Sequence, residues 1–273
     1  VQLSEQGVQP GDSCLLAVMT DNSDDKNFPP GKRQYTLDFA YHGGIYRDVW
    51  MIGKSSVAIT DALEADKVAG GGVFVHFDNI SGKKAEVYVD TEVHNSGKRT
   101  RTVAVETVLA DAGDVPVKRI SQQVKLQAGE SKTVRQQFAV RNPKLWSPDS
   151  PYLYRIQSRV KAGHEVLDGG VTRVGIRKAE FKGKDGFWLN GKPFGQLVGA
   201  NRHQDFAYVG NALPNSQQWR DAKRLRDAGC TIIRVAHYPQ DPAFMDACDE
   251  MGLFVIVATP GWQYWNKNPE FAK

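Results

Sequence analysis

The chain has 273 residues, enough for two domains, and 41% of them are hydrophobic, a proportion typical of a globular protein. Its formal net charge is +4, but lysine and arginine are scattered among acidic residues, which does not favour a nucleic-acid partner. No apolar run approaches the roughly 20 residues that span a bilayer, and the three cysteines lie outside any CxxC pair, which disfavours a disulfide framework or a zinc or redox site.

Residues 1–51 are predicted to hold only a few strands. An apolar run covers 14–19, and two more short strands are predicted at 35–39 and 45–51, after a polar loop that contains proline. Three strands bury too little apolar surface to fold alone, so we expect this segment to be the last part of a larger β-domain. The first residues show no signal-peptide pattern and no initiator methionine, which suggests an internal cut.

Residues 52–177 are predicted to form an antiparallel β-sandwich. Apolar and polar residues alternate in the runs 86–93, 102–109 and 152–160, and a period of two is typical of strands with one buried face. Glycine-containing turns separate these runs. Roughly seven short strands in about 120 residues fit an immunoglobulin-like sandwich, although the Cys-Trp-Cys pattern of antibody domains is missing.

In residues 178–273 strands and helices alternate. The dipeptide Asn190-Gly191 predicts the turn of a hairpin over 187–194. A helix follows, for which Asn215 is the predicted N-cap and Gln218 the capping-box partner.

A second helix is predicted to begin at Asp241-Pro242 and to end at Gly252. Strands are predicted at 197–200, 231–235 and 253–258, a spacing that gives right-handed parallel crossovers. We expect the inner face of the resulting sheet to take its apolar side chains from among Val198, Ile233, Val235, Val255 and Val257.

Polar side chains follow two of these strands. Asn201-Arg202-His203 comes after the first, and Arg234 to Pro239, which includes His237, closes the second. Parallel β/α barrels keep their active sites at the carboxyl ends of their strands, so His203 and His237 can face one another across a pocket. The alternative is that both are rim histidines bonded to the backbone.

These strings, together with Gly43-Gly44-Ile45-Tyr46-Arg47-Asp48-Val49, resemble family 2 glycoside hydrolases, the β-galactosidase, β-glucuronidase and β-mannosidase group. The resemblance implies a mostly β plus α/β chain: 1–51 as the end of a jelly-roll sugar-binding domain, 52–177 as an immunoglobulin-like sandwich, and 178–273 as the first strands of a TIM (β/α)8 barrel. It also implies a retaining, β-galactosidase-like exo-β-glycosidase that removes terminal β-linked sugars from oligo- or polysaccharides without an organic cofactor.

The resemblance assigns roles to individual residues. Those implied to bind substrate are Asp38, His203, His237, Trp262 and Trp265, and those implied to support the site are Asn201, Arg202 and Arg234. Tryptophan rings at a barrel mouth can stack on sugar faces. The alternatives are that Asp38 caps a turn and that the two tryptophans only pack the rim. For Arg202 and Arg234 the alternative is a structural role in an ion pair at the barrel mouth. Arg47 and Asp48 are expected to form an interdomain salt bridge.

The catalytic pair of the family is not found in this sequence. Its two glutamates follow the fourth and seventh barrel strands, and neither Glu250 nor Glu270 fits those motifs, so the chain alone is expected to be inactive. The run Ala258-Thr259-Pro260 stands where well-known β-galactosidases carry acidic and histidine metal ligands. This departure counts against the family magnesium site and against a galactose preference.

A competing interpretation is a non-catalytic carbohydrate-binding or interaction protein with the same architecture. The sequence is compatible with an oligomer but does not predict one. It assigns no compartment either, although a periplasmic or secreted location suits a polysaccharide-degrading protein better than the cytoplasm does.

Overall fold

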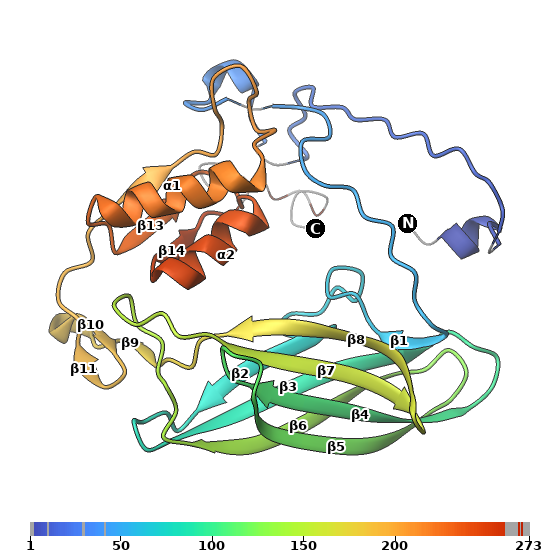
Figure 1. Ribbon diagram of the computed structural model, residues 1–273. Helices are drawn as coiled ribbons and strands as arrows, with labels where there is room; N and C mark the ends of the chain where they lie inside the picture. Colours follow the sequence, from blue (N-terminus) through green and yellow to red (C-terminus); the bar gives the residue numbers. More distant parts are fainter. Residues whose placement is uncertain are drawn as a thin grey trace.

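The computed structural model describes residues 3–9, 11–28, 31–40, 42–259, 267 and 269. It shows an extended N-terminal segment, a β-sandwich, a small antiparallel sheet, and a parallel sheet with two helices on one side (Figure 1). No helix among the described residues is long and apolar enough to cross a membrane.

The sandwich consists of two four-stranded antiparallel sheets. In the first, β3 pairs with β6 along one edge and with both β1 and β2 along the other; the second has the order β5-β4-β7-β8. Its eight strands are β1 (Val57–Ile59), β2 (Val73–Asp78), β3 (Lys84–Asn95), β4 (Arg101–Ala110), β5 (Pro116–Leu126), β6 (Ser131–Arg141), β7 (Tyr154–Ala162) and β8 (Glu165–Val174).

The predicted alternation produces the core of this sandwich. Val87, Val89 and Val93 of β3 are fully buried between the sheets, where they meet apolar residues of β4, β6 and β7. Asp90 and Glu92, which lie between them, are buried as well, and each pairs with a cationic side chain. Asp90 accepts hydrogen bonds of 2.8 and 2.6 Å from the guanidinium of Arg135. A buried carboxylate is tolerated only when it is paired in this way.

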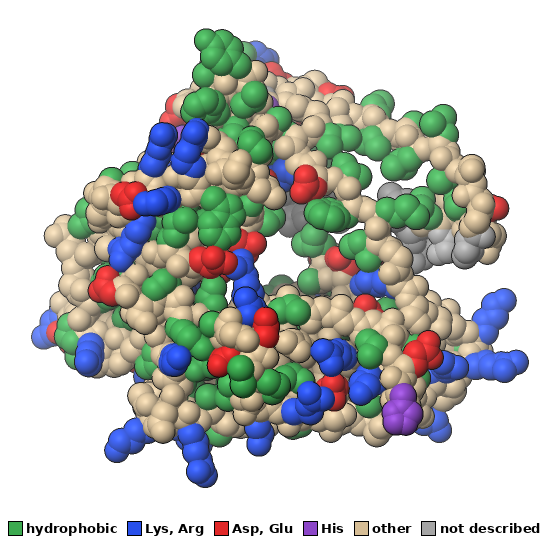
Figure 2. Space-filling view, in the orientation of Figure 1, with side chains coloured by type: hydrophobic (Ala, Val, Ile, Leu, Met, Phe, Trp, Pro, Cys, Tyr) green, Lys and Arg blue, Asp and Glu red, His purple; other side chains and the backbone are tan. Residues whose placement is uncertain are grey.

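The extended N-terminal segment differs from the prediction. Before Val57 the described residues hold only two short 3-10 turns, η1 (Leu3–Gln6) and η2 (Gln34–Thr36), so the strands predicted at 14–19, 35–39 and 45–51 do not form. A strand exists only where a neighbour pairs with its backbone, and no described strand pairs with this segment. Many of its apolar side chains therefore stay exposed (Figure 2). Leu15, for example, is 96% exposed. That residues 1–51 belong to a jelly roll remains a prediction.

The third region begins with a small antiparallel sheet and continues into the parallel one. Asn190 and Gly191 both have positive φ angles, 52° and 79°, as the predicted hairpin turn requires. The strands and helices are β9 (Ala179–Phe181), η3 (Gly183–Asp185), β10 (Phe187–Leu189), β11 (Lys192–Pro193), β12 (Gly199–Arg202), α1 (Asn215–Asp227), β13 (Ile232–Val235), α2 (Pro242–Met251) and β14 (Phe254–Val257).

One of the two helix starts was predicted correctly. In α2, Asp241 is the N-cap and its Oδ1 accepts a hydrogen bond of 2.8 Å from the backbone N–H of Ala243, while Gly252 ends the helix in the left-handed region. In α1, Pro214 takes the N-cap position that was predicted for Asn215. No capping box forms, because the side chain of Gln218 turns inward and is buried.

The two faces of the parallel sheet are exchanged relative to the prediction. Ile233 and Val235, expected on the inner face, are fully buried against α1 and α2, and Val255 packs on the same cluster. Because side chains alternate along a strand, the inner face instead carries the in-register row Asn201, Arg234 and Ile256.

Trp146 joins the sandwich to the helical side of the parallel unit. Its ring is fully buried, lies edge-on to Phe254 at 5.3 Å, and its Nε1–H donates a hydrogen bond of 2.8 Å to the backbone oxygen of Asp249. Arg173 of β8 adds ion pairs to Asp246 and Glu250 of α2. The sandwich thus packs against α2 and against the beginning of β14.

Candidate functional site

The rings of His203 and His237 lie next to each other where β12 and β13 end, as the sequence predicted. Their centroids are 5.2 Å apart and the rings are nearly perpendicular, at 80°. Two further rings complete this group. Phe39 of the N-terminal segment lies 5.9 Å from His203 and 5.5 Å from His237, and Tyr238 lies 5.6 Å from Phe39. Residues far apart in the sequence therefore meet at one edge of the sheet.

The geometry around His237 fixes which ring nitrogen can donate. Nη1 of Arg234 lies 3.0 Å from Nδ1 of His237. A guanidinium can only donate, so Nδ1 accepts and a neutral ring carries its proton on Nε2. Burial lowers the pKa of His237 below its usual value, and the charges of Arg234 and His203 lower it further, whereas the carboxylate of Asp38 opposes them. His237 is thus set up as a neutral hydrogen-bond donor.

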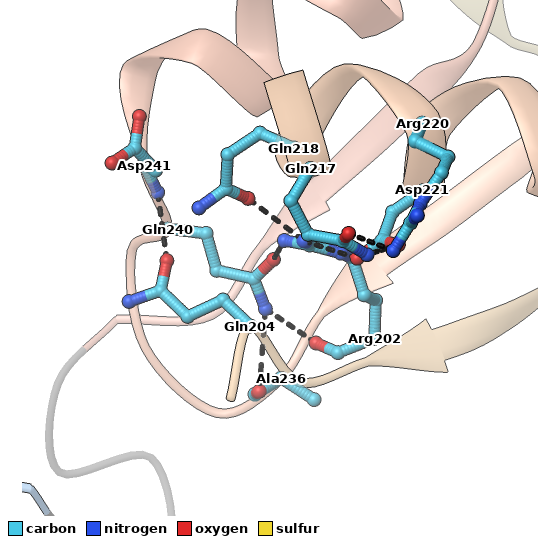
Figure 3. Close-up of polar contacts among 9 residues, drawn as sticks. All are labelled: Arg202, Gln204, Gln217, Gln218, Arg220, Asp221, Ala236, Gln240 and Asp241. Atoms are coloured by element: carbon cyan, nitrogen blue, oxygen red, sulfur yellow. Dashed lines mark hydrogen bonds and ion pairs between the residues drawn. The ribbon is translucent and has the colours of Figure 1, made fainter. Parts of the chain in front are cut away.

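Arg202, by contrast, does not reach this inner edge. Its guanidinium is buried on the helical side of the sheet, 4.0 Å from the centroid of the Phe244 ring. Its Nη2 donates to Gln218 and Asp221, each at 2.7 Å, and its Nη1 donates to Gln240 at 2.6 Å (Figure 3). A buried charge must be compensated by such partners.

Further hydrogen bonds tie the end of β12 to the loop that precedes α2. The Nε2 of Gln240 donates to the backbone oxygen of Arg202, and the backbone N–H of Ala236 donates to the same oxygen at 3.0 Å. The backbone N–H of Asp241 donates to Oε1 of Gln204 at 2.9 Å. The residues on either side of His203 are therefore both bonded to the loop that carries His237.

The N-terminal segment is fastened to the same loop. Arg47 donates from Nη2 to the backbone oxygen of Pro239 at 3.2 Å, and its Nε lies 3.8 Å from Oδ2 of Asp241. Of the two residues expected to form an interdomain salt bridge, Arg47 therefore contacts Asp241, whereas Asp48 forms no ion pair among the described residues. That this contact joins two domains remains a prediction.

The structure brings together some of the predicted site residues but not all of them. Asp38, His203, His237 and Arg234 are brought together, and Asn201 shares the inner face with Arg234. Arg202 lies on the helical side of the sheet instead, paired with Asp221, and its support of the site remains a prediction. Trp262 and Trp265 lie outside the described residues. No group of three potential metal ligands occurs in the part of the chain that is described.

Four residues of this site were not predicted from the sequence: Phe39, Gln204, Tyr238 and Gln240. Each glutamine had a recognisable signal of its own. Gln204 lies two residues after Arg202 and shares its side of the chain, and Gln240 lies next to a helix cap. The aromatic contact of Phe39 had none, because its partners are about 160 to 200 positions away in the sequence.

Comparisons with known proteins assign most of the chain. Residues 72–177 match the family model for glycosyl hydrolases family 2, and residues 180–269 match the TIM barrel domain of the same family. A β-galactosidase of Thermoanaerobacter pseudethanolicus is 34% identical over 256 residues, which are 92% of this chain and 31% of that protein. A putative β-glucuronidase of Formosa agariphila is 32% identical over 260 residues, 93% of this chain and 29% of that protein.

Solved structures of proteins with these two names are also similar to this chain. A putative β-galactosidase from Bacteroides fragilis superimposes with a TM-score of 0.81 at 30% identity, covering 88% of this chain and 35% of that one. A Bacteroides uniformis β-glucuronidase 2, covalently bound to cyclophellitol-6-carboxylate aziridine, gives 0.82 at 28% identity, covering 92% and 29%. The chain spans about a third of the length of the curated relatives it matches.

Proposed function

Because this chain belongs to glycosyl hydrolases family 2, we propose that the whole protein is a retaining exo-β-glycosidase that removes terminal β-linked sugars from oligo- or polysaccharides. Relatives named β-galactosidase and β-glucuronidase support this class of reaction. In this proposal the chain supplies one wall of the subsite that holds the terminal sugar.

The observation that carries the proposal is the convergence of Asp38, His203 and His237 at the carboxyl edge of a parallel sheet. A neutral His237 donates from Nε2 to a sugar hydroxyl or to charge that develops on it, and Asp38 accepts from a hydroxyl. Phe39 and Tyr238 add apolar ring surface beside these polar groups, which suits the C–H face of a sugar.

The catalytic carboxylates are proposed to come from residues other than these 273. A retaining glycosidase needs two carboxyl groups about 5 to 5.5 Å apart across the scissile bond. Glu250 does not qualify, since it pairs with Arg173 of the sandwich on the far side of α2. Glu270 lies outside the described residues.

A panel of nitrophenyl β-glycosides, including the galactoside and the glucuronide, tests the proposal on the full-length protein. We expect turnover of at least one of them, and a His237→Ala variant with kcat/KM lowered about 10²-fold, because a donor aimed at transition-state charge contributes a few kcal/mol. The control is His164→Ala, which removes an exposed histidine of the sandwich and should change nothing.

The same panel separates the alternatives. Sugar binding without turnover by the full-length protein would favour the non-catalytic carbohydrate-binding interpretation. Turnover by the 273-residue chain itself, lost on mutation of one of its residues, would show that the catalytic pair lies within it. A change below threefold in His237→Ala, with the fold intact, would remove this histidine from the subsite.

A further inference from the structure

Gln240 lies three residues after His237, in the loop between β13 and α2, and its side chain is almost fully buried, with 5% exposed. It takes part in the hydrogen-bond network around Arg202, on the helical side of the sheet (Figure 3). When both the oxygen and the nitrogen of a buried side-chain amide are hydrogen-bonded, the loop that carries it has little freedom to move.

We propose that Gln240 is a positioning residue that fixes the loop of residues 236–241 to the end of β12 and thereby sets the separation of the His203 and His237 rings. Its importance for activity rests on the proposed function; its effect on the geometry does not.

The amide of Gln240 acts as acceptor and donor at once. Its Oε1 accepts from Nη1 of Arg202, and its Nε2 donates to the backbone oxygen of Arg202 and lies 3.5 Å from the backbone oxygen of Ala236. One side chain therefore bridges both chain segments that lead to the two histidines. Glutamate at this position would keep the acceptor and lose the donor, and methionine would lose both.

Arg202, the residue to which Gln240 is bonded, is itself held firmly in place. Arg202 is held by Gln218 and Asp221 of α1 and lies against the ring of Phe244 in α2. Removing one partner from a buried charge network is costly, so its arrangement is strongly determined. Gln240 thus ties the loop to both helices as well as to β12.

The ring separation follows from this backbone connection. His203 stands between Arg202 and Gln204, which both point to the helical side and bind the loop through Gln240 and Asp241. His237 stands one residue after Ala236, whose backbone N–H is bonded to the oxygen of Arg202. Both histidines are therefore attached to one network on the face opposite to their own rings, and the 5.2 Å between the rings depends on it.

Proton NMR of the histidine rings in this chain tests the geometry without any substrate, since the chain has only six histidines. In Gln240→Met we expect the ring signals of His203 and His237 to move, and the pKa of His237 to rise toward its usual value as water enters. The charged groups that face His237 are Arg234, His203 and Asp38, and all three are retained in this variant.

The matched control is Gln136→Met in the sandwich. Gln136 is equally buried, with 1% exposed, and its Nε2 donates to the backbone oxygen of Val105 at 2.9 Å. This variant should lose stability and leave the signals of His203 and His237 unchanged. Unchanged signals in a folded Gln240→Met variant would overturn the proposal. If Gln240→Met does not fold, the test uses Gln240→Glu, which keeps the hydrogen bond from Arg202. The ring signals of His203 and His237 must then move in Gln240→Glu, and unchanged signals in that variant would also overturn the proposal.

Activity of the full-length protein provides the second readout. A displacement of about 1 Å can cost roughly 10²-fold in rate, so kcat/KM should fall about 10- to 100-fold in Gln240→Met, and Gln136→Met should match the unmodified protein. If the unmodified protein has no glycosidase activity but the NMR shifts occur, the proposed function is wrong and the positioning role stands. Full activity together with unmoved signals in Gln240→Met would leave the function intact and refute the positioning role.

Discussion

Trp146 should control the stability of the parallel unit more than that of the sandwich to which it belongs. Trp146→Phe keeps an aromatic ring but removes the Nε1–H that donates to the backbone oxygen of Asp249 in α2. An acceptor left without its donor in a buried position costs about 1–3 kcal/mol. Trp146→Ala also removes the buried ring beside Phe254, for which about 3–5 kcal/mol is expected.

Hydrogen exchange measured by mass spectrometry locates the effect. In Trp146→Phe the amides of α2 and β14 should exchange roughly 5- to 150-fold faster, which is the factor that corresponds to about 1–3 kcal/mol. Amides of β3 and β4 should keep their protection, because we expect residues 52–177 to fold independently and the parallel unit to depend on its neighbours.

The control is Trp188→Phe in the hairpin. Trp188 also donates from Nε1, to the backbone oxygen of Asp185 at 3.1 Å, but this bond stays within one exposed turn. It should leave α2 unaffected. Equal exchange in α2 for both variants would refute the role given to Trp146, and so would a loss of protection in β3 as large as that in α2.

Three further expectations concern single side chains. Gly252 and Gly229 both have positive φ, so alanine costs roughly 1–2 kcal/mol at either; in urea unfolding Gly252→Ala should cost more, since only its Cβ would collide with backbone atoms. Hydrogen bonds from Arg135 lower the pKa of Asp90, so its stabilising effect is present above about pH 4 and is lost as the pH falls through the lowered value. Asp90→Asn should therefore flatten the acid side of the stability profile. Burial raises the pKa of the Cys248 thiol to about 12, so it should not react with a disulfide reagent at mildly alkaline pH until the chain is unfolded.

The features that the sequence predicted correctly are those decided by nearby residues. Asn190 and Gly191 tolerate the positive φ angles of a tight hairpin turn whatever surrounds them. Asp241 and Gly252 begin and end α2 through their own backbone contacts. The alternation in β3 predicted a strand with one face in the core, and the valines are buried there. The start of α1 was predicted one residue late, since Pro214 has the extended backbone of the N-cap. The predicted capping box is missing, and Gln218 bonds to Arg202 instead.

In the candidate site, too, some contacts could be predicted from the sequence and others could not. Spacing alone placed His203 and His237 after neighbouring parallel strands, and parallel strands bring their carboxyl ends to one edge of a sheet, so the pair was predictable. The contact with Phe39 was not, since it depends on how the N-terminal segment passes over the loop.

The sequence by itself determined the period of each segment, the turns and helix ends, and the order of the parallel strands. It did not determine which way the faces of the parallel sheet point, because alternation gives two sets of side chains without saying which one meets the helices. Nor did it determine whether 14–19 forms a strand, since the backbone of a strand must pair with a neighbour. The tertiary structure decided both, together with the hydrogen bonds of Gln240 that join the two histidine-bearing segments.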